Sequence, residues 1–196
     1  MPIEGGSPAE CFERFREHVA KLVSTILSDV PPVLVMRGAG TRATMSFPGD
    51  QTMRLETTVG ELQLHLGQAL EAYAREGSAK LFTLRTSAYW YRLHWADESE
   101  LLRWEYVREH RPEGPNFPRN HVHIHGTVTT PSGTTLVLQK FHIPTGWTTI
   151  EGIIRFLITD LAVAPRTQEW PKLLMESERL FRNEFVPRGP WSPAGA

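Results

Sequence analysis

The first hydrophobic pattern in the chain is helical. Between residues 7 and 29 the apolar side chains recur at intervals of three and four residues, which predicts an amphipathic helix. Ser7 followed by Pro8 is a typical N-cap and first-turn pair, and Pro31-Pro32 would end the helix.

The next segments are predicted to be short strands followed by a helix. Residues 33–47 and 52–57 are typical of short strands broken by glycine and proline turns, so we expect a small β-meander. Thr57 or Thr58 can then cap a helix that runs to about Arg75. Its predicted buried face carries four side chains, Leu62, Leu66, Leu70 and Tyr73.

After residue 80 the pattern is that of strands. Residues 80–96, 100–107, 121–130 and 134–143 are rich in aromatic and β-branched side chains, and turn-forming residues separate them. We interpret them as four successive antiparallel strands.

The last third returns to a helical period. One helix would begin at Thr148 or Thr149, and a second would follow Pro165. The sequence therefore predicts an α+β fold with a single domain over residues 1–186. In this fold an antiparallel β-sheet, with about four main strands in residues 80–143, packs on N-terminal and C-terminal helices. Residues 187–196 would form a flexible C-terminal tail.

Composition and charge narrow the class of protein. A chain of 196 residues with 40% hydrophobic residues can bury the core of one globular domain. The 21 basic and 22 acidic side chains nearly cancel, so any phosphate recognition must be local. One cysteine rules out an intramolecular disulfide, and we find no export signal or membrane-spanning apolar run, so we expect a cytoplasmic protein.

The segment NHVHIHGTV concentrates the candidate chemistry. Because alternate side chains of a strand share a face, His121, His123 and His125 should project together, while Val122 and Ile124 point to the core. Alternation along the neighbouring strands places further polar residues on one face. These residues cannot point into the core between the sheet and the helices, so they must share the face of the histidines. The polar face then carries Arg92, His94, Arg103, Glu105, His121, His123, His125, Lys140 and His142.

Two chemistries suit the histidines. His121, His123 and His125 could chelate zinc or another divalent metal, with Glu105 or His142 completing the shell. Alternatively, a histidine could act as base or nucleophile without any cofactor, beside cations that bind a phosphoryl group. The cations favour the second chemistry, because they repel a metal ion and attract phosphate. A solvated or partner-binding sheet face would also be polar.

Two families resemble parts of this chain. HVHIHGT is similar to the histidine-triad motif of nucleotide hydrolases and transferases, which would make His123 the nucleophile, although Gly126-Thr127 replaces the usual apolar pair. A longer stretch, from residues 89–126 on to the two C-terminal helices, resembles small toxins of bacterial toxin-antitoxin pairs. The resemblance is carried by Arg103-Trp104-Glu105 and by His121 and His123 after a proline-rich loop. The partner of such toxins is a helix-turn-helix antitoxin.

The sequence therefore predicts an enzyme that cleaves phosphodiester or phosphoanhydride bonds, a ribonuclease-type toxin or defence protein. The expected catalytic residues are His121, His123 and Glu105. The expected substrate-binding residues are Arg92, His94, Arg103, His125, Lys140, His142 and Trp90, the last as a stacking platform for a base. RNA or a nucleotide would be the substrate and a cognate antitoxin the partner. The alternatives are a non-catalytic binding module for protein or nucleic acid, and a histidine-ligated metalloenzyme.

Overall fold

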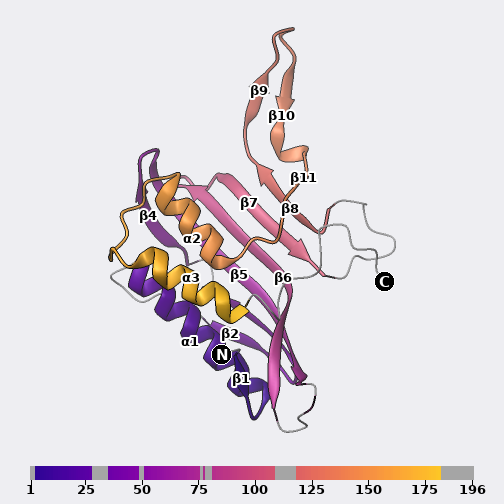
Figure 1. Ribbon diagram of the computed structural model, residues 1–196. Coiled ribbons are helices and arrows are strands. Elements are labelled where there is room, and N and C mark those ends of the chain that lie inside the picture. Colours follow the sequence, from indigo (N-terminus) through magenta and orange to yellow (C-terminus); the bar gives the residue numbers. More distant parts are fainter. Residues whose placement is uncertain are drawn as a thin grey trace.

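A nine-stranded antiparallel sheet organises the protein (Figure 1). The structure is a computed structural model, which describes residues 3–27, 35–48, 51–75, 77, 81–108 and 118–181. The strands pair in the order β11 (Ile143–Pro144), β8 (Asn120–Ile124), β7 (Glu100–Val107), β6 (Phe82–Trp95), β5 (Gly60–Ala74), β3 (Arg42–Ser46) and β2 (Val35–Ala39). Off this path, β1 (Glu4–Gly5) pairs with β6, and β4 (Met53–Thr57) pairs with β5.

Helices cover one side of this sheet. Figure 1 shows α1 (Pro8–Ile26), α2 (Ile150–Thr159) and α3 (Trp170–Phe181) on the same face. A separate hairpin of β9 (Thr127–Thr129) and β10 (Thr135–Val137) projects from one end, followed by the 3-10 helix η1 (Leu138–Lys140). The α+β class and the antiparallel sheet predicted from the sequence are confirmed. Among the described helices, none is long and apolar enough to cross a membrane.

The helix starts predicted at Ser7 and at Thr148 or Thr149 are confirmed. The Ser7 side chain accepts a hydrogen bond from the Glu10 backbone N–H at 3.2 Å, and Pro8 occupies the first turn of α1. Thr149 caps α2 in the same way, accepting from the Gly152 N–H at 3.0 Å. The proline pair predicted to end the first helix, most of the proline-rich loop and the C-terminal tail lie outside the described residues.

The predicted helix from Thr57 or Thr58 to about Arg75 is wrong. This segment is β5, a long strand beside β6. Leu62, Leu64 and Leu66 are all buried, at 0%, 1% and 3% exposure, which is the period of a strand. The Thr57 hydroxyl donates to the Gly60 carbonyl at 2.6 Å and forms the turn between β4 and β5 instead of a helix cap. Leucines four residues apart fit both periods, and the burial of the intervening Leu64 in the folded structure shows that the strand period applies.

The two last predicted strands are broken. The segment 121–130 divides at Gly126, whose φ of +141° takes the chain out of β8 and into the projecting hairpin. The segment 134–143 divides into β10, η1 and β11, so that Lys140 lies in η1 and Phe141 is 48% exposed instead of facing the core. Of the fourth predicted strand, only the end pairs with β8, as the two-residue strand β11.

The main core lies between the sheet and its helices. Tyr89, Tyr91 and Tyr106 are almost completely buried on the helix side of β6 and β7, and the Tyr89 and Tyr91 rings stack 4.7 Å apart. Trp147, just before α2, packs edge-on against Tyr89 at 5.3 Å. Because these aromatic side chains occupy one face, alternation places the polar residues of the same strands on the opposite face.

Replacement of Leu64 tests the strand assignment of β5. We expect Leu64→Ala to lower the free energy of unfolding by about 2–5 kcal/mol, because it opens a cavity in the core. Glu61→Ala, on the outward face of the same strand, should change it by about 0.5 kcal/mol or less. Chemical denaturation measures both. A helix through Leu62, Leu66 and Leu70 would direct residue 64 to solvent, so equal small effects would contradict the strand.

Candidate functional site

The register of three strands gathers the predicted polar residues on the face opposite the helices. Arg92 of β6 pairs with Arg103 of β7, which pairs with His123 of β8. Two residues further along, Trp90, Glu105 and His121 form a parallel row across the same three strands. Residues up to 20 positions apart in the chain therefore lie on neighbouring strands about 4.8 Å apart.

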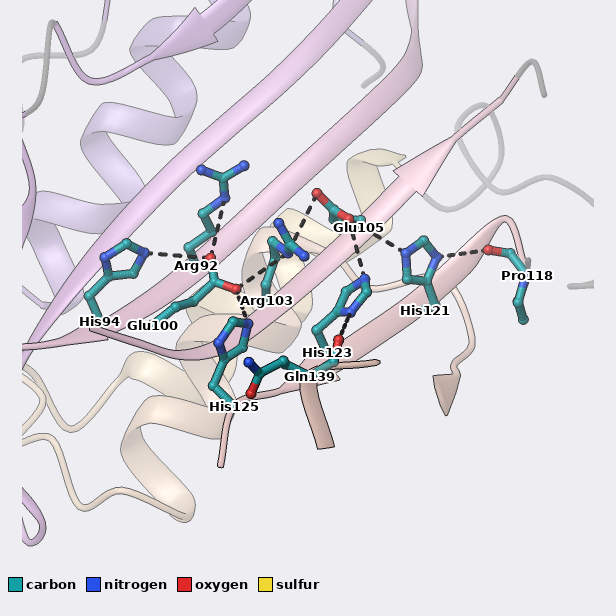
Figure 2. A network of polar contacts seen from close by, with 10 residues as sticks. All are labelled: Arg92, His94, Glu100, Arg103, Glu105, Pro118, His121, His123, His125 and Gln139. Carbon is teal, nitrogen blue, oxygen red and sulfur yellow. Dashed lines mark hydrogen bonds and ion pairs between the residues drawn. The ribbon is translucent and has the colours of Figure 1, made fainter. Parts of the chain in front are cut away.

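His121, Glu105 and His123 form the centre of the candidate site (Figure 2). The Nε2 atoms of the two histidines lie 3.5 Å and 3.6 Å from the same carboxylate oxygen, Oε2 of Glu105. Both histidines are buried, at 2% and 4% exposure, whereas the Glu105 side chain is 27% exposed. Arg103 Nε lies 3.7 Å from the other oxygen, Oε1. The carboxylate is thus the point where two imidazoles and a guanidinium meet.

The backbone fixes the orientation of both imidazoles. His121 Nδ1 lies 2.7 Å from the Pro118 carbonyl, and His123 Nδ1 lies 3.2 Å from the Gln139 carbonyl. Since a carbonyl only accepts, each Nδ1 carries the proton and donates it. In a neutral ring the Nε2 atom therefore presents a lone pair toward Glu105. The two rings are prepared to accept a proton or to bind a cation at Nε2.

The environment shifts the protonation of these groups. Interaction with His121 lowers the pKa of Glu105, and burial opposes this effect, so the carboxyl group is ionised at neutral pH. Burial lowers the pKa of His123, partly offset by its hydrogen bond to Gln139 and reinforced by nearby Arg103. Burial also lowers the pKa of His142. Ionised Glu105 thus lies beside a His123 ring that favours its neutral form.

The third histidine of the cluster is His142, not His125. The His142 ring lies 4.5 Å from the His123 ring and 5.0 Å from the His121 ring, between centroids. One ligand atom from each of these three residues lies within 4.8 Å of the others. His125 instead forms an ion pair with Glu100 at 2.5 Å. The metal set expected from the strand pattern thus has one member replaced, because the chain leaves β8 at Gly126 and returns through β11.

Glu100 was missed by the sequence analysis. Its side chain is 14% exposed and is surrounded by four cationic or protonatable groups: Arg103 at 3.4 Å, His94 at 3.8 Å, Arg92 at 3.9 Å and His125. Strict alternation from Glu105 would place Glu100 on the helix side. A β-bulge pairs Leu93 with Leu102 but His94 with Glu100, which moves this carboxylate to the polar face.

The contacts of Glu100 are electrostatic. Its Oε1 atom has no partner that meets hydrogen-bond geometry, although His125 and Arg103 lie close to it. Figure 2 shows Arg103 between Glu100 and Glu105, so that one guanidinium joins the two carboxylates. The polar face therefore contains two linked clusters, one around each carboxylate.

The other two predicted residues take different positions. Lys140 is exposed at the end of η1, and within the described chain its side chain has no ion pair with either carboxylate. Its neighbour Gln139 provides the carbonyl that holds His123. Trp90 is half-buried beside Glu105 in the register of β6 and β7, and its indole occupies the space above Gly67 of β5.

The fold and the site define an α+β protein with a histidine, carboxylate and arginine cluster on the sheet face opposite its helices. A family model described as Toxin TumE matches residues 54–154, slightly more than half of the chain. The chain therefore belongs to the Toxin TumE family. The match extends from Arg54 in β4 into α2 and includes all of the candidate site residues from Trp90 to His142. No curated protein and no solved structure gave a match.

Family membership confirms the resemblance to toxins of toxin-antitoxin pairs that was drawn from Arg103-Trp104-Glu105 and the histidines. It also implies a cognate antitoxin as the partner of this protein. The matched span begins at Arg54, so α1, β2 and β3 lie outside it.

Removal of the Glu100 charge tests the electrostatic role of this residue. We expect Glu100→Gln to lower the free energy of unfolding by roughly 3 kcal/mol, because Arg92 and Arg103 would lose their shared carboxylate. Glu98→Gln, in the exposed turn just before β7, is the matched control. Urea denaturation of the two variants gives the comparison, and equal stabilities would show that the Glu100 cluster is only a solvated surface.

Proposed function

We propose that this toxin cleaves phosphodiester or phosphoanhydride bonds of RNA or a nucleotide in the cytoplasm. The observation that carries the proposal is the convergence of His121 Nε2 and His123 Nε2 on one oxygen of Glu105, beside Arg103. Cleavage of a phosphodiester requires a base, an acid and a positive charge near the phosphoryl oxygens. These four residues supply all three in one place.

The environments of the two histidines suit different roles. His123, whose neutral form is favoured by burial, would accept the proton of the attacking hydroxyl. His121, which interacts with ionised Glu105, would donate a proton to the leaving oxygen, and Glu105 would hold it in position. A direct attack by His123 on phosphorus, as the histidine-triad resemblance implies, would use the same Nε2 lone pair.

The cations of the face would bind the phosphate. Arg103 is the nearest to the histidines, and Arg92 continues the positive charge along β6. Lys140 is exposed beside the residue that holds His123, where it can contact a second phosphate of an extended substrate. The guanidinium groups stay charged at every physiological pH, so they favour an anionic substrate throughout.

Single substitutions should distinguish catalysis from simple binding. We expect His121→Ala, His123→Ala and Glu105→Gln each to lower the rate of RNA or nucleotide cleavage by about 100-fold or more, measured with purified protein in a chelating buffer. Arg103→Ala should have a comparable effect. Lys172→Ala, on the exposed surface of α3, serves as the control. A binding module would instead lose affinity in small steps and show no cleavage in the wild type, and this outcome would refute the proposal.

A metal-dependent hydrolase is the second candidate, and a specific observation favours it. Tetrahedral zinc with bonds of about 2.1 Å places its ligands about 3.4 Å apart, close to the 3.5 Å and 3.6 Å that separate Glu105 from the two histidines. Metal-bound histidines commonly donate their second ring nitrogen to a carbonyl, as both histidines do here. His142 would be the third imidazole.

Elemental analysis separates the two candidates. For the metal-dependent enzyme we expect about one zinc or other transition metal per chain in protein purified without an affinity tag, and loss of that metal in His142→Ala. For the acid–base enzyme we expect cleavage to continue after dialysis against chelator and His142→Ala to retain most of the rate. Metal retained in His142→Ala would exclude the set of three histidines.

A further inference from the structure

A second polar feature lies on the same sheet face, two strands away from β8. A cavity of about 270 Å³ is lined by Trp90 and Arg92 of β6, His65 of β5, and Ser46 and Gln51 from the N-terminal part of the chain. The volume is just below the roughly 300–1,000 Å³ of small-molecule pockets, so the cavity suits one planar group such as a nucleobase. Its walls offer hydroxyl, amide and imidazole groups for the edge of such a ring.

Gly67 determines where the Trp90 indole lies. A Cβ atom on Gly67 would come within 2.0 Å of ring atom Cε2 and 2.1 Å of Nε1 of Trp90. Since glycine has no side chain, the indole can lie over β5 at Gly67 and form part of the cavity wall. Trp90 and Ser46 both pair with Gly67 from opposite sides, so the three residues share one face.

The cavity and the candidate catalytic cluster are connected. Trp90 pairs directly with Glu105 across β6 and β7, and Glu105 pairs with His121 across β7 and β8, so Trp90 lies about 10 Å from His121, the spacing of two strands. Arg92 lines the cavity and also contacts Glu100. Glu100 in turn contacts Arg103, which reaches Glu105. A chain of ion pairs thus runs from the cavity to the site, with Arg92 at the cavity and Arg103 at the site. This arrangement suits a ligand with a base at one end and a phosphate at the other.

We propose that this cavity binds the nucleobase of the nucleotide whose phosphate lies at the His121, Glu105 and His123 site, with the base stacked on Trp90. The inference rests on the proposed function for the identity of its ligand. Aromatic stacking accepts any base, whereas Ser46, Gln51 and His65 can select among bases by hydrogen bonds. The cavity also uses residues before Arg54, so part of the specificity comes from outside the span that matches the family.

Binding of nucleoside 5′-monophosphates, measured by titration calorimetry, tests the inference without turnover. We expect Trp90→Ala to raise the dissociation constant roughly 5- to 150-fold, and Trp90→Phe to raise it less. Gly67→Ala should raise the dissociation constant as much as Trp90→Ala does, because the new methyl group displaces the indole. Unfolding midpoints check that each variant is folded, and Trp90→Phe preserves the test if Gly67→Ala fails to fold.

Indole fluorescence locates the ligand. Nucleotide should quench the emission of the wild type and of Trp95→Phe, whose indole packs against the core, but should leave that of Trp90→Phe unchanged. A 2′-deoxy dinucleotide lacks the attacking hydroxyl and therefore serves as an uncleavable analogue of RNA. If it binds more tightly than a mononucleotide, the ligand is RNA-like; if it does not, the ligand is a free mononucleotide. Inorganic phosphate that binds as tightly as nucleotide, or nucleotide affinity unchanged in Trp90→Ala, would overturn the inference.

The binding and cleavage assays can refute the cavity and the hydrolase separately. Trp90-dependent nucleotide binding without any cleavage would support the cavity and refute the proposed hydrolase. Cleavage that requires His123 but proceeds with the same KM in Trp90→Ala would support the hydrolase and refute the cavity. Absence of nucleotide binding in the wild type would overturn the cavity as a base-binding site.

Discussion

Burial of one face of β5 and β6 against three helices is the constraint on which the other features depend. Most of the inward residues of these strands are leucines and tyrosines that are almost fully buried. Since successive side chains of a strand point to opposite faces, this burial fixes the register and directs the ionisable residues outward. A shift by one residue would bury Arg92 and Arg103 among the helices, where unpaired charge is costly. The core therefore selects the arrangement of the polar face.

Charge on that face is balanced locally. Glu100 lies among Arg92, Arg103 and two histidines, and Glu105 lies between Arg103 and two other histidines. Arg103 contacts both carboxylates, so the two clusters are coupled through a single side chain. A polar face that only served solubility would not require histidines that are less exposed than the apolar residues between them.

Cover over the histidines comes from the chain that follows β8. The hairpin takes the chain away at Gly126, and η1 and β11 return it, so that the Gln139 carbonyl and the His142 ring meet His123. This return lies within the span that matches the Toxin TumE family, together with both carboxylates. The family match thus covers the whole cluster, whereas the cavity beside Trp90 also depends on the preceding segment.

The sequence by itself determined the α+β class, the helix starts at Ser7 and Thr149, and the shared face of Arg103, Glu105, His121 and His123. These features follow from local rules of capping and alternation. Only the tertiary structure decided three others. Leucines spaced by four in β5 fit a helix as well as a strand, and pairing with β6 selected the strand. The bulge opposite His94 brought in Glu100, and the return through η1 and β11 substituted His142 for His125. Each depends on contacts between distant segments, which no local period in the chain encodes.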